Sequence, residues 1–107
     1  MQFSTYSGSG IEGSDDQTLL LTGAGSGPGK GTVVKTLELI TGDASCKAHV
    51  IRKDATGVTY GDISVDLKAR DYLLLWEGFV FIPAGHRLLF TADSDGFRII
   101  ASCIEIQ

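Results

Sequence analysis

Residues 82–106 read IPAGHRLLFTADSDGFRIIASCIEI, and this stretch decides the fold class of the chain. Two segments rich in strand-forming residues, 86–92 and 97–106, flank the tetrapeptide DSDG at 93–96, whose residue types favour a tight turn. The glycine that ends this turn can adopt the positive φ that such turns need. The stretch therefore predicts an antiparallel β-hairpin at the C-terminus.

The same pattern of short apolar segments and turns extends through the rest of the chain. At 107 residues the chain is long enough for one domain with a single core, and its 14 glycines against 2 prolines suit many tight turns. The candidate strands are residues 17–22, 32–41, 45–53, 57–60, 62–68, 71–76, 79–82, 86–92 and 97–106. This spacing predicts an all-β, single-domain antiparallel β-sandwich of seven or eight strands, with jelly-roll or Ig-like topology.

Alternation along the strands predicts which residues form the core. Ile63, Val65 and Leu67 alternate with polar residues, which indicates a strand with one buried face and one solvated face. Trp76 is placed in the core, because aromatic residues in strands pack inside more often than they bind ligands. The predicted core is Leu37, Leu39, Val50, Val65, Leu67, Leu74, Trp76, Phe81, Leu88, Phe90, Phe97 and Ile99.

The two ends of the chain are the candidate assembly surface. Residues 1–16 are rich in Gly, Ser and Asp and are predicted to form an extended N-terminal arm before a β-sandwich domain at 17–107. The last strand is apolar on both faces and needs a second cover, which is either another subunit or the arm folding back. The predicted interface residues are Phe3, Tyr6 and Ile11 of the arm and Ile100, Ile104 and Ile106 of the last strand.

Composition argues against several classes of protein. A formal net charge of −4 with 9 scattered basic residues disfavours nucleic-acid binding. No apolar run approaches the roughly 20 residues that span a bilayer, and the N-terminal residues lack the features of a signal peptide. We therefore expect folding in a cytoplasm, with no membrane partner. Cys46 and Cys103 are too few for a disulfide scaffold and are predicted to be buried free thiols.

A glycine-rich segment at 24–32, AGSGPGKGT, is similar to a phosphate-binding loop. Such a loop needs glycine at both ends of a fixed span, followed by a helix whose N-terminus faces the phosphates. Ala24 occupies the first glycine position, and Pro28 removes one backbone donor. The β-branched residues that follow favour a strand. A surface loop is therefore the preferred interpretation, and a nucleotide-binding enzyme would require a helix after Thr32.

Other polar residues also have structural explanations. The DSDG segment at 93–96 lacks the further oxygen ligands of a calcium loop. His49 and His86 are isolated in the sequence and are interpreted as surface residues. Asp15 and Asp16 lie on the predicted arm, which gives no fixed geometry for acid–base chemistry. No catalytic, cofactor or metal site is predicted.

In its turn placement and strand order, the chain resembles the small β-sandwich virion proteins of tailed bacteriophages, over residues 17–106. The segments that carry this resemblance are PGK (28–30), ITGD (40–43), RKDATG (52–57), IPAGHRL (82–88) and IIAS (99–102). Members of that group bind to the surface of the capsid or form part of the neck or the tail, and they are present in repeated copies. The resemblance thus implies a non-enzymatic virion protein, made in the host cytoplasm, that forms a homo-oligomer and contacts other virion proteins. The alternative is a carbohydrate- or receptor-binding β-sandwich, which would need exposed aromatic residues near Trp76 or Tyr72.

Overall fold

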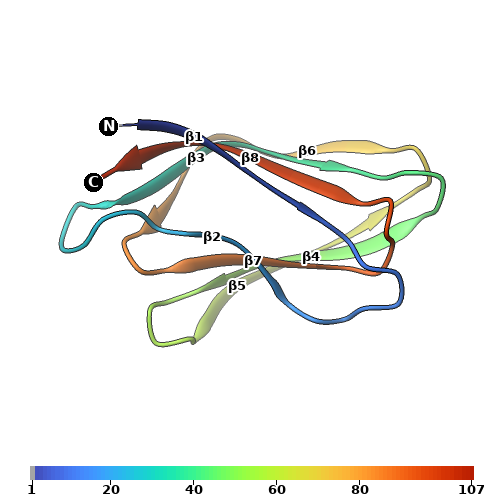
Figure 1. Ribbon diagram of the computed structural model, residues 1–107, viewed down its shortest axis with the longest axis horizontal. Helices are drawn as coiled ribbons and strands as arrows, with labels where there is room; N and C mark the ends of the chain where they lie inside the picture. Colours follow the sequence, from blue (N-terminus) through green and yellow to red (C-terminus); the bar gives the residue numbers. More distant parts are fainter. Residues whose placement is uncertain (1) are drawn as a thin grey trace.

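The computed structural model describes residues 2–107, which form eight β-strands and no helix. The strands are β1 (Gln2–Ser9), β2 (Thr18–Thr22), β3 (Gly31–Ile40), β4 (Cys46–Lys53), β5 (Thr59–Leu67), β6 (Tyr72–Pro83), β7 (Arg87–Ala92) and β8 (Arg98–Ile106). They form two four-stranded sheets in the orders β1-β8-β3-β6 and β2-β7-β4-β5, seen as two layers in Figure 1. All the strand pairs are antiparallel. The predicted antiparallel β-sandwich is confirmed.

The strand pairing is that of one long hairpin rolled into two layers. β4 pairs with β5 at the tip of this hairpin, and β3 with β6, β2 with β7 and β1 with β8 form successive pairs away from it. Two further pairs, β3 with β8 and β4 with β7, join these units into the two sheets. This arrangement is an eight-stranded jelly roll, which is one of the two predicted topologies.

The predicted extended arm over residues 1–16 is not confirmed, because half of it is a strand of the sandwich. Residues 2–9 form β1, which pairs with β8 along its whole length. Tyr6 points into the sandwich and packs against the core. Without β1, β8 would present an unpaired edge to solvent, and pairing satisfies those backbone groups. Residue 1 lies outside the described residues.

The core lies between the two sheets and contains most of the predicted residues. Val65 and Trp76 are partly buried and pack against it. Its buried members are Leu20, Leu21, Val34, Leu37, Leu39, Cys46, Ala48, Val50, Leu67, Ile82, Leu88, Phe90, Ala92, Phe97, Ile99, Ala101 and Cys103. Leu74 and Phe81 were predicted in the core, but they are 37% and 44% exposed.

The bulge at Leu75 explains the error at Leu74, whereas Phe81 was assigned within a separate strand predicted at 79–82. The register against β3 shifts where Leu75 is inserted, so Leu75 and Trp76 both pack against the core while Leu74 points outward. A second shift involves Gly78, whose φ of 116° is readily adopted only by glycine. Bulges of this kind interrupt the simple alternation of faces, so an alternation rule assigns the wrong face beyond them.

The other expectations about secondary structure concern helices. The segment after Thr32 belongs to β3, so the helix that a nucleotide-binding loop would require is not formed. Within residues 2–107, no helix has the length and hydropathy needed to cross a membrane.

Candidate assembly surface

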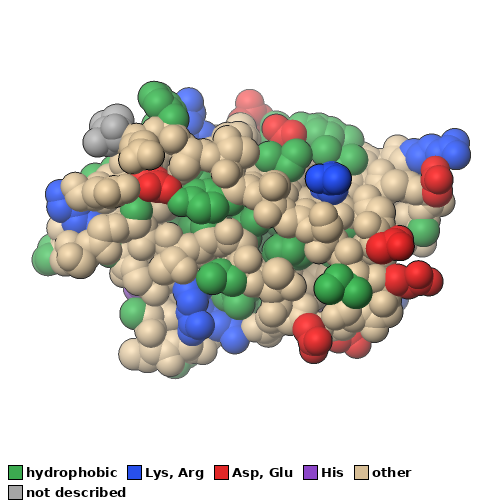
Figure 2. All heavy atoms as spheres, in the orientation of Figure 1, with side chains coloured by type: hydrophobic (Ala, Val, Ile, Leu, Met, Phe, Trp, Pro, Cys, Tyr) green, Lys and Arg blue, Asp and Glu red, His purple; other side chains and the backbone are tan. Residues whose placement is uncertain are grey.

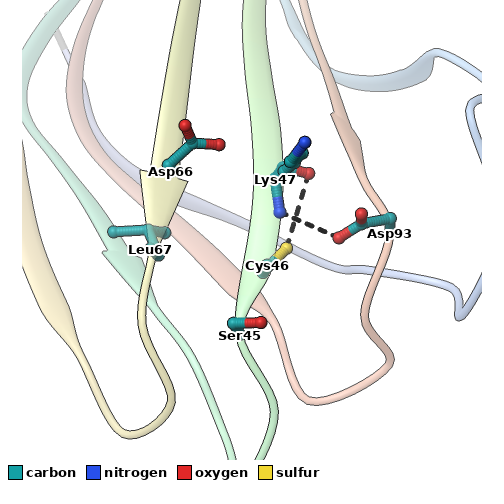
Figure 3. A pocket seen from close by; sticks show the side chains of 6 residues that line it. All are labelled: Ser45, Cys46, Lys47, Asp66, Leu67 and Asp93. Atoms are coloured by element: carbon teal, nitrogen blue, oxygen red, sulfur yellow. Dashed lines mark hydrogen bonds between the residues drawn. The ribbon is translucent and has the colours of Figure 1, made fainter.

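A hollow of about 220 Å³ lies where β4, β5 and the β7–β8 loop meet (Figure 3). Its lining residues are Ser45, Cys46, Lys47, Asp66, Leu67 and Asp93. The backbone N–H of Lys47 donates to Asp93 Oδ1 over 2.8 Å, so this carboxylate already serves the main chain. Burial raises the pKa of the Cys46 thiol, which keeps the sulfur protonated. A nucleophilic cysteine needs a thiolate, so the raised pKa disfavours Cys46 as a nucleophile.

Cys103 is also a buried free thiol, as predicted for both cysteines. Burial, followed by the charge of Glu105, raises the pKa of Cys103 to about 11. Both thiols therefore behave as small apolar core residues.

The two histidines lie apart from each other. His49 Nδ1 is 2.9 Å from Asp62 Oδ1 on the exposed surface of the β4–β5 pair. His86 Nδ1 is 3.3 Å from the Tyr60 hydroxyl. Among the residues that the structure describes, no group of three His, Cys, Asp or Glu side chains is placed to hold a metal ion.

The most prominent surface feature is an apolar row across the β1-β8-β3-β6 sheet. We call the side of this sheet that faces away from the core the outer face. Phe3 on β1 is opposite Ile104 on β8, Ile104 is opposite Val33 on β3, and Val33 is opposite Phe81 on β6. This apolar row therefore crosses all four strands. Phe3 is 74% exposed.

More apolar side chains extend the apolar row along β6 and β8. Phe79, two residues before Phe81 on the edge strand β6, is 77% exposed. Ile106 and Ile100 lie on the same side of β8 as Ile104, between the buried residues of that strand. Figure 2 shows green hydrophobic side chains exposed along the upper layer, which in Figure 1 contains these strands.

The outer face is not flat. A hollow of about 360 Å³ lies beside Phe3, where the small residues Thr5 and Ser102 are opposite each other on β1 and β8. The lining residues are Phe3, Ser4, Thr5, Lys35, Ser102 and Cys103. The outer face thus has both protruding phenylalanine side chains and a hollow, and a partner surface of complementary shape could pack against them.

The structure brings together four of the six predicted interface residues. Phe3 and Ile104 are direct neighbours, and Ile100 and Ile106 share their face. Tyr6 lies on the opposite side of β1, facing the core, and Ile11 is exposed in the loop that follows the far end of β1.

Sequence reasoning missed the contribution of β3 and β6 to this surface. Val33, Phe79 and Phe81 complete it, and Phe81 had been assigned to the core. The sequence did contain a signal for this surface. Phe79 and Phe81 are two residues apart, so they lie on one side of a strand, and Gly78 just before them is a residue type that often marks a bulge.

Comparison with known proteins found no match to this chain among family models, curated proteins or solved structures.

Proposed function

We propose that this chain is a non-enzymatic structural protein of a tailed-bacteriophage virion, synthesised in the host cytoplasm and present in repeated copies on the capsid, neck or tail. The observation that supports the proposal best is the apolar row of Phe3, Ile104, Val33 and Phe81, extended by Phe79. Contiguous exposed apolar surface of this kind is typical of protein–protein interaction sites.

The occupant that we propose for the outer face is a second copy of the chain. The apolar row runs from one edge of the sheet to the other, so a second sheet laid against it could cover all four strands. Two sheets packed face to face are a common way to bury apolar side chains. The four residues of the apolar row are uncharged, and Lys35 on β3 is a charged side chain that lines the adjoining hollow.

The fold is compatible with this role but does not single it out. Eight-stranded jelly rolls occur in viral capsid proteins and also in lectins, so the topology alone is only an analogy. The resemblance to phage virion proteins and the unpartnered outer face both favour assembly.

The test compares two double variants in analytical ultracentrifugation and native mass spectrometry. Phe79→Ser with Phe81→Ser removes the two exposed rings of β6, while Leu19→Ser with Val58→Ser removes exposed apolar side chains away from the outer face. We expect the wild type and the control to form the same oligomer, and the β6 variant to associate roughly 100-fold more weakly. A wild type that is monomeric at high concentration would contradict self-assembly.

The virion role needs its own measurement. Purified particles from which the protein has been removed should bind wild-type protein in a co-sedimentation assay, and the β6 variant should bind them poorly. Failure of the wild type to bind any such particle, despite forming an oligomer, would contradict the virion role and leave self-assembly intact.

The alternative function, a carbohydrate- or receptor-binding module, is supported by one specific observation. Tyr72 is exposed on the outward side of β6, next to Leu74, as such a module would require. A protein that stays monomeric and binds a saccharide would favour this alternative over assembly.

A further inference from the structure

Arg52 lies close to two aromatic rings that come from different sheets. Its guanidinium carbon is 5.5 Å from the ring centroid of Tyr60 on β5 and 5.7 Å from that of Trp76 on β6. Arg52 itself is on β4, opposite Gly61 of β5. A Cβ at position 61 would lie 2.8 Å from Arg52 Nε, so glycine leaves the space that the guanidinium occupies. The arginine is therefore held in a defined place at the β5–β6 edge of the sandwich.

The guanidinium of Arg52 lacks an anionic partner within the described part of the chain. The ion pairs formed by residues 2–107 are His49 with Asp62 and Arg70 with Asp43. Within residues 2–107, Arg70 is the only arginine whose side chain donates a hydrogen bond, so the Arg52 guanidinium has no hydrogen-bond acceptor there. The guanidinium carries its N–H groups in a planar fork, and this fork can bind a carboxylate with two parallel hydrogen bonds.

The charges nearby reinforce this preference for an anion. Lys53 and Arg87 are directly opposite each other on β4 and β7, and like charges in that position repel. The neighbouring Asp54 accepts hydrogen bonds at Oδ1 from Thr56 and from the Val58 N–H within the β4–β5 turn, and among residues 2–107 it forms no ion pair with either cation. Figure 2 shows Lys and Arg side chains gathered at the lower left, beside that turn, in a protein with a net charge of −4.

Tyr60 adds an aromatic surface beside the guanidinium. Its side chain is exposed, and its hydroxyl lies 3.3 Å from His86 Nδ1. The two rings meet edge to face, with centroids 5.6 Å apart, so His86 fixes the orientation of the tyrosine. Ligand sites commonly combine such aromatic surface with a few placed polar groups.

We propose that Arg52, Tyr60 and Trp76 form a binding site for a saccharide that carries a carboxylate. In this site the guanidinium pairs with the carboxylate, and the exposed ring of Tyr60 packs against the sugar ring. The site is separate from the outer face, and it adds a ligand-binding activity to the proposed structural role.

Trp76 is the only tryptophan of the chain, so all tryptophan emission comes from a residue of this site. The experiment titrates the full chain with glucuronate, glucose, acetate and inorganic phosphate and follows Trp76 emission. We expect a saturable change with glucuronate, with a dissociation constant of about 1 mM, and little change with glucose. Arg52→Gln should weaken glucuronate binding roughly tenfold or more.

Two further variants make the test specific. Arg52→Lys keeps the charge and loses the planar fork, and it should also bind more weakly. Lys47→Gln removes an exposed positive charge from the other end of β4 and should bind like the wild type. Thermal unfolding of each variant establishes that it is folded before it is titrated.

Three results would overturn the proposal. They are the absence of a saturable response to glucuronate, an equal response in Arg52→Gln and the wild type, or acetate and phosphate binding as tightly as glucuronate. Repeating the titration with the Phe79→Ser, Phe81→Ser variant separates the two proposals, because this variant should still bind glucuronate even if it no longer assembles.

Discussion

Gly8 on β1 lies against the ring of Phe90 on β7, which belongs to the opposite sheet. A Cβ at position 8 would be 2.6 Å from each of two ring carbons of Phe90, and Phe90 is fully buried. The contact requires glycine because a buried ring has little room to move. A residue that looks like part of a flexible segment is thus fixed by core packing.

Gly8→Ala should therefore destabilise the fold. Because the added methyl overpacks a filled core, we expect a loss of about 1–3 kcal/mol in the free energy of unfolding. Urea denaturation measures this loss, and Ser7→Ala, an exposed neighbour on the same strand, should change the free energy little. Equal effects of the two substitutions would mean that Gly8 does not face Phe90.

Deletion of residues 2–9 should destabilise the monomer itself. The deletion removes a strand that pairs along its length with β8 and exposes the edge of β8 and the core beneath Tyr6. We expect a lower unfolding temperature and aggregation through the exposed edge. Circular dichroism melts and size-exclusion chromatography test this expectation. A soluble, monomeric deletion variant with wild-type thermal stability would restore the interpretation of these residues as a dispensable arm.

The strands that could be predicted from sequence are those with local signals. Ile63, Val65 and Leu67 alternate cleanly, and the structure places that segment in β5 with this side directed inward. β1 lacks such a signal, since its sequence QFSTYSGS has few strand-forming apolar residues. It becomes a strand because its partner β8 lies some 90 residues away in the chain, a non-local pairing that local propensity does not reveal.

Phe90→Ala and Leu74→Ala should differ sharply in their cost. Phe90 is fully buried between the sheets, so its truncation should cost about 3–5 kcal/mol. Leu74 points outward, so its truncation should cost less than about 1 kcal/mol in the monomer. Urea denaturation at a concentration that keeps the protein monomeric provides the comparison. A similar loss at the two positions would show that β6 presents Leu74 to the core.

The candidate assembly surface could be predicted only in part. The apolar outward side of β8 is visible in the alternation of its sequence, and it led to Ile100, Ile104 and Ile106. The rows that join neighbouring strands depend on register, and in β6 the register is set by bulges at Leu75 and Gly78. Register across a sheet is a property of the folded chain, so Phe81 could not be placed opposite Val33 from sequence alone.

The Tyr6–Glu105 hydrogen bond should make stability depend on pH. The Tyr6 hydroxyl donates to Glu105 Oε1, which also accepts from Ser4 Oγ over 2.9 Å. Both hydrogen bonds lower the pKa of Glu105 below its usual value, and the bond from Tyr6 has the larger effect. The pKa of Tyr6 is raised, first by the same bond and then by burial. Because of these two pKa shifts, the hydrogen bond contributes fully to the free energy of unfolding only at intermediate pH.

The sign of each effect follows from linkage. The contribution of Glu105 is fully present above its unfolded pKa of about 4.3, and it is lost as the pH falls through the lower folded pKa. The contribution of Tyr6 is fully present below its unfolded pKa of about 10 and is lost as the pH rises through the higher folded pKa. Stability from this pair should therefore fall in acid and again in strong base.

Tyr6→Phe should remove this contribution and its dependence on acid. At pH 7 we expect a loss of about 1–2 kcal/mol, because the carboxylate loses a charge-assisted hydrogen bond. The difference between the wild type and the variant should shrink as Glu105 becomes protonated in acid. Urea denaturation at neutral pH and at a series of acidic pH values measures it, with Tyr72→Phe, an exposed tyrosine on β6, as the matched control. A difference that stays constant from neutral to strongly acidic pH would show that Glu105 does not titrate through its bond to Tyr6.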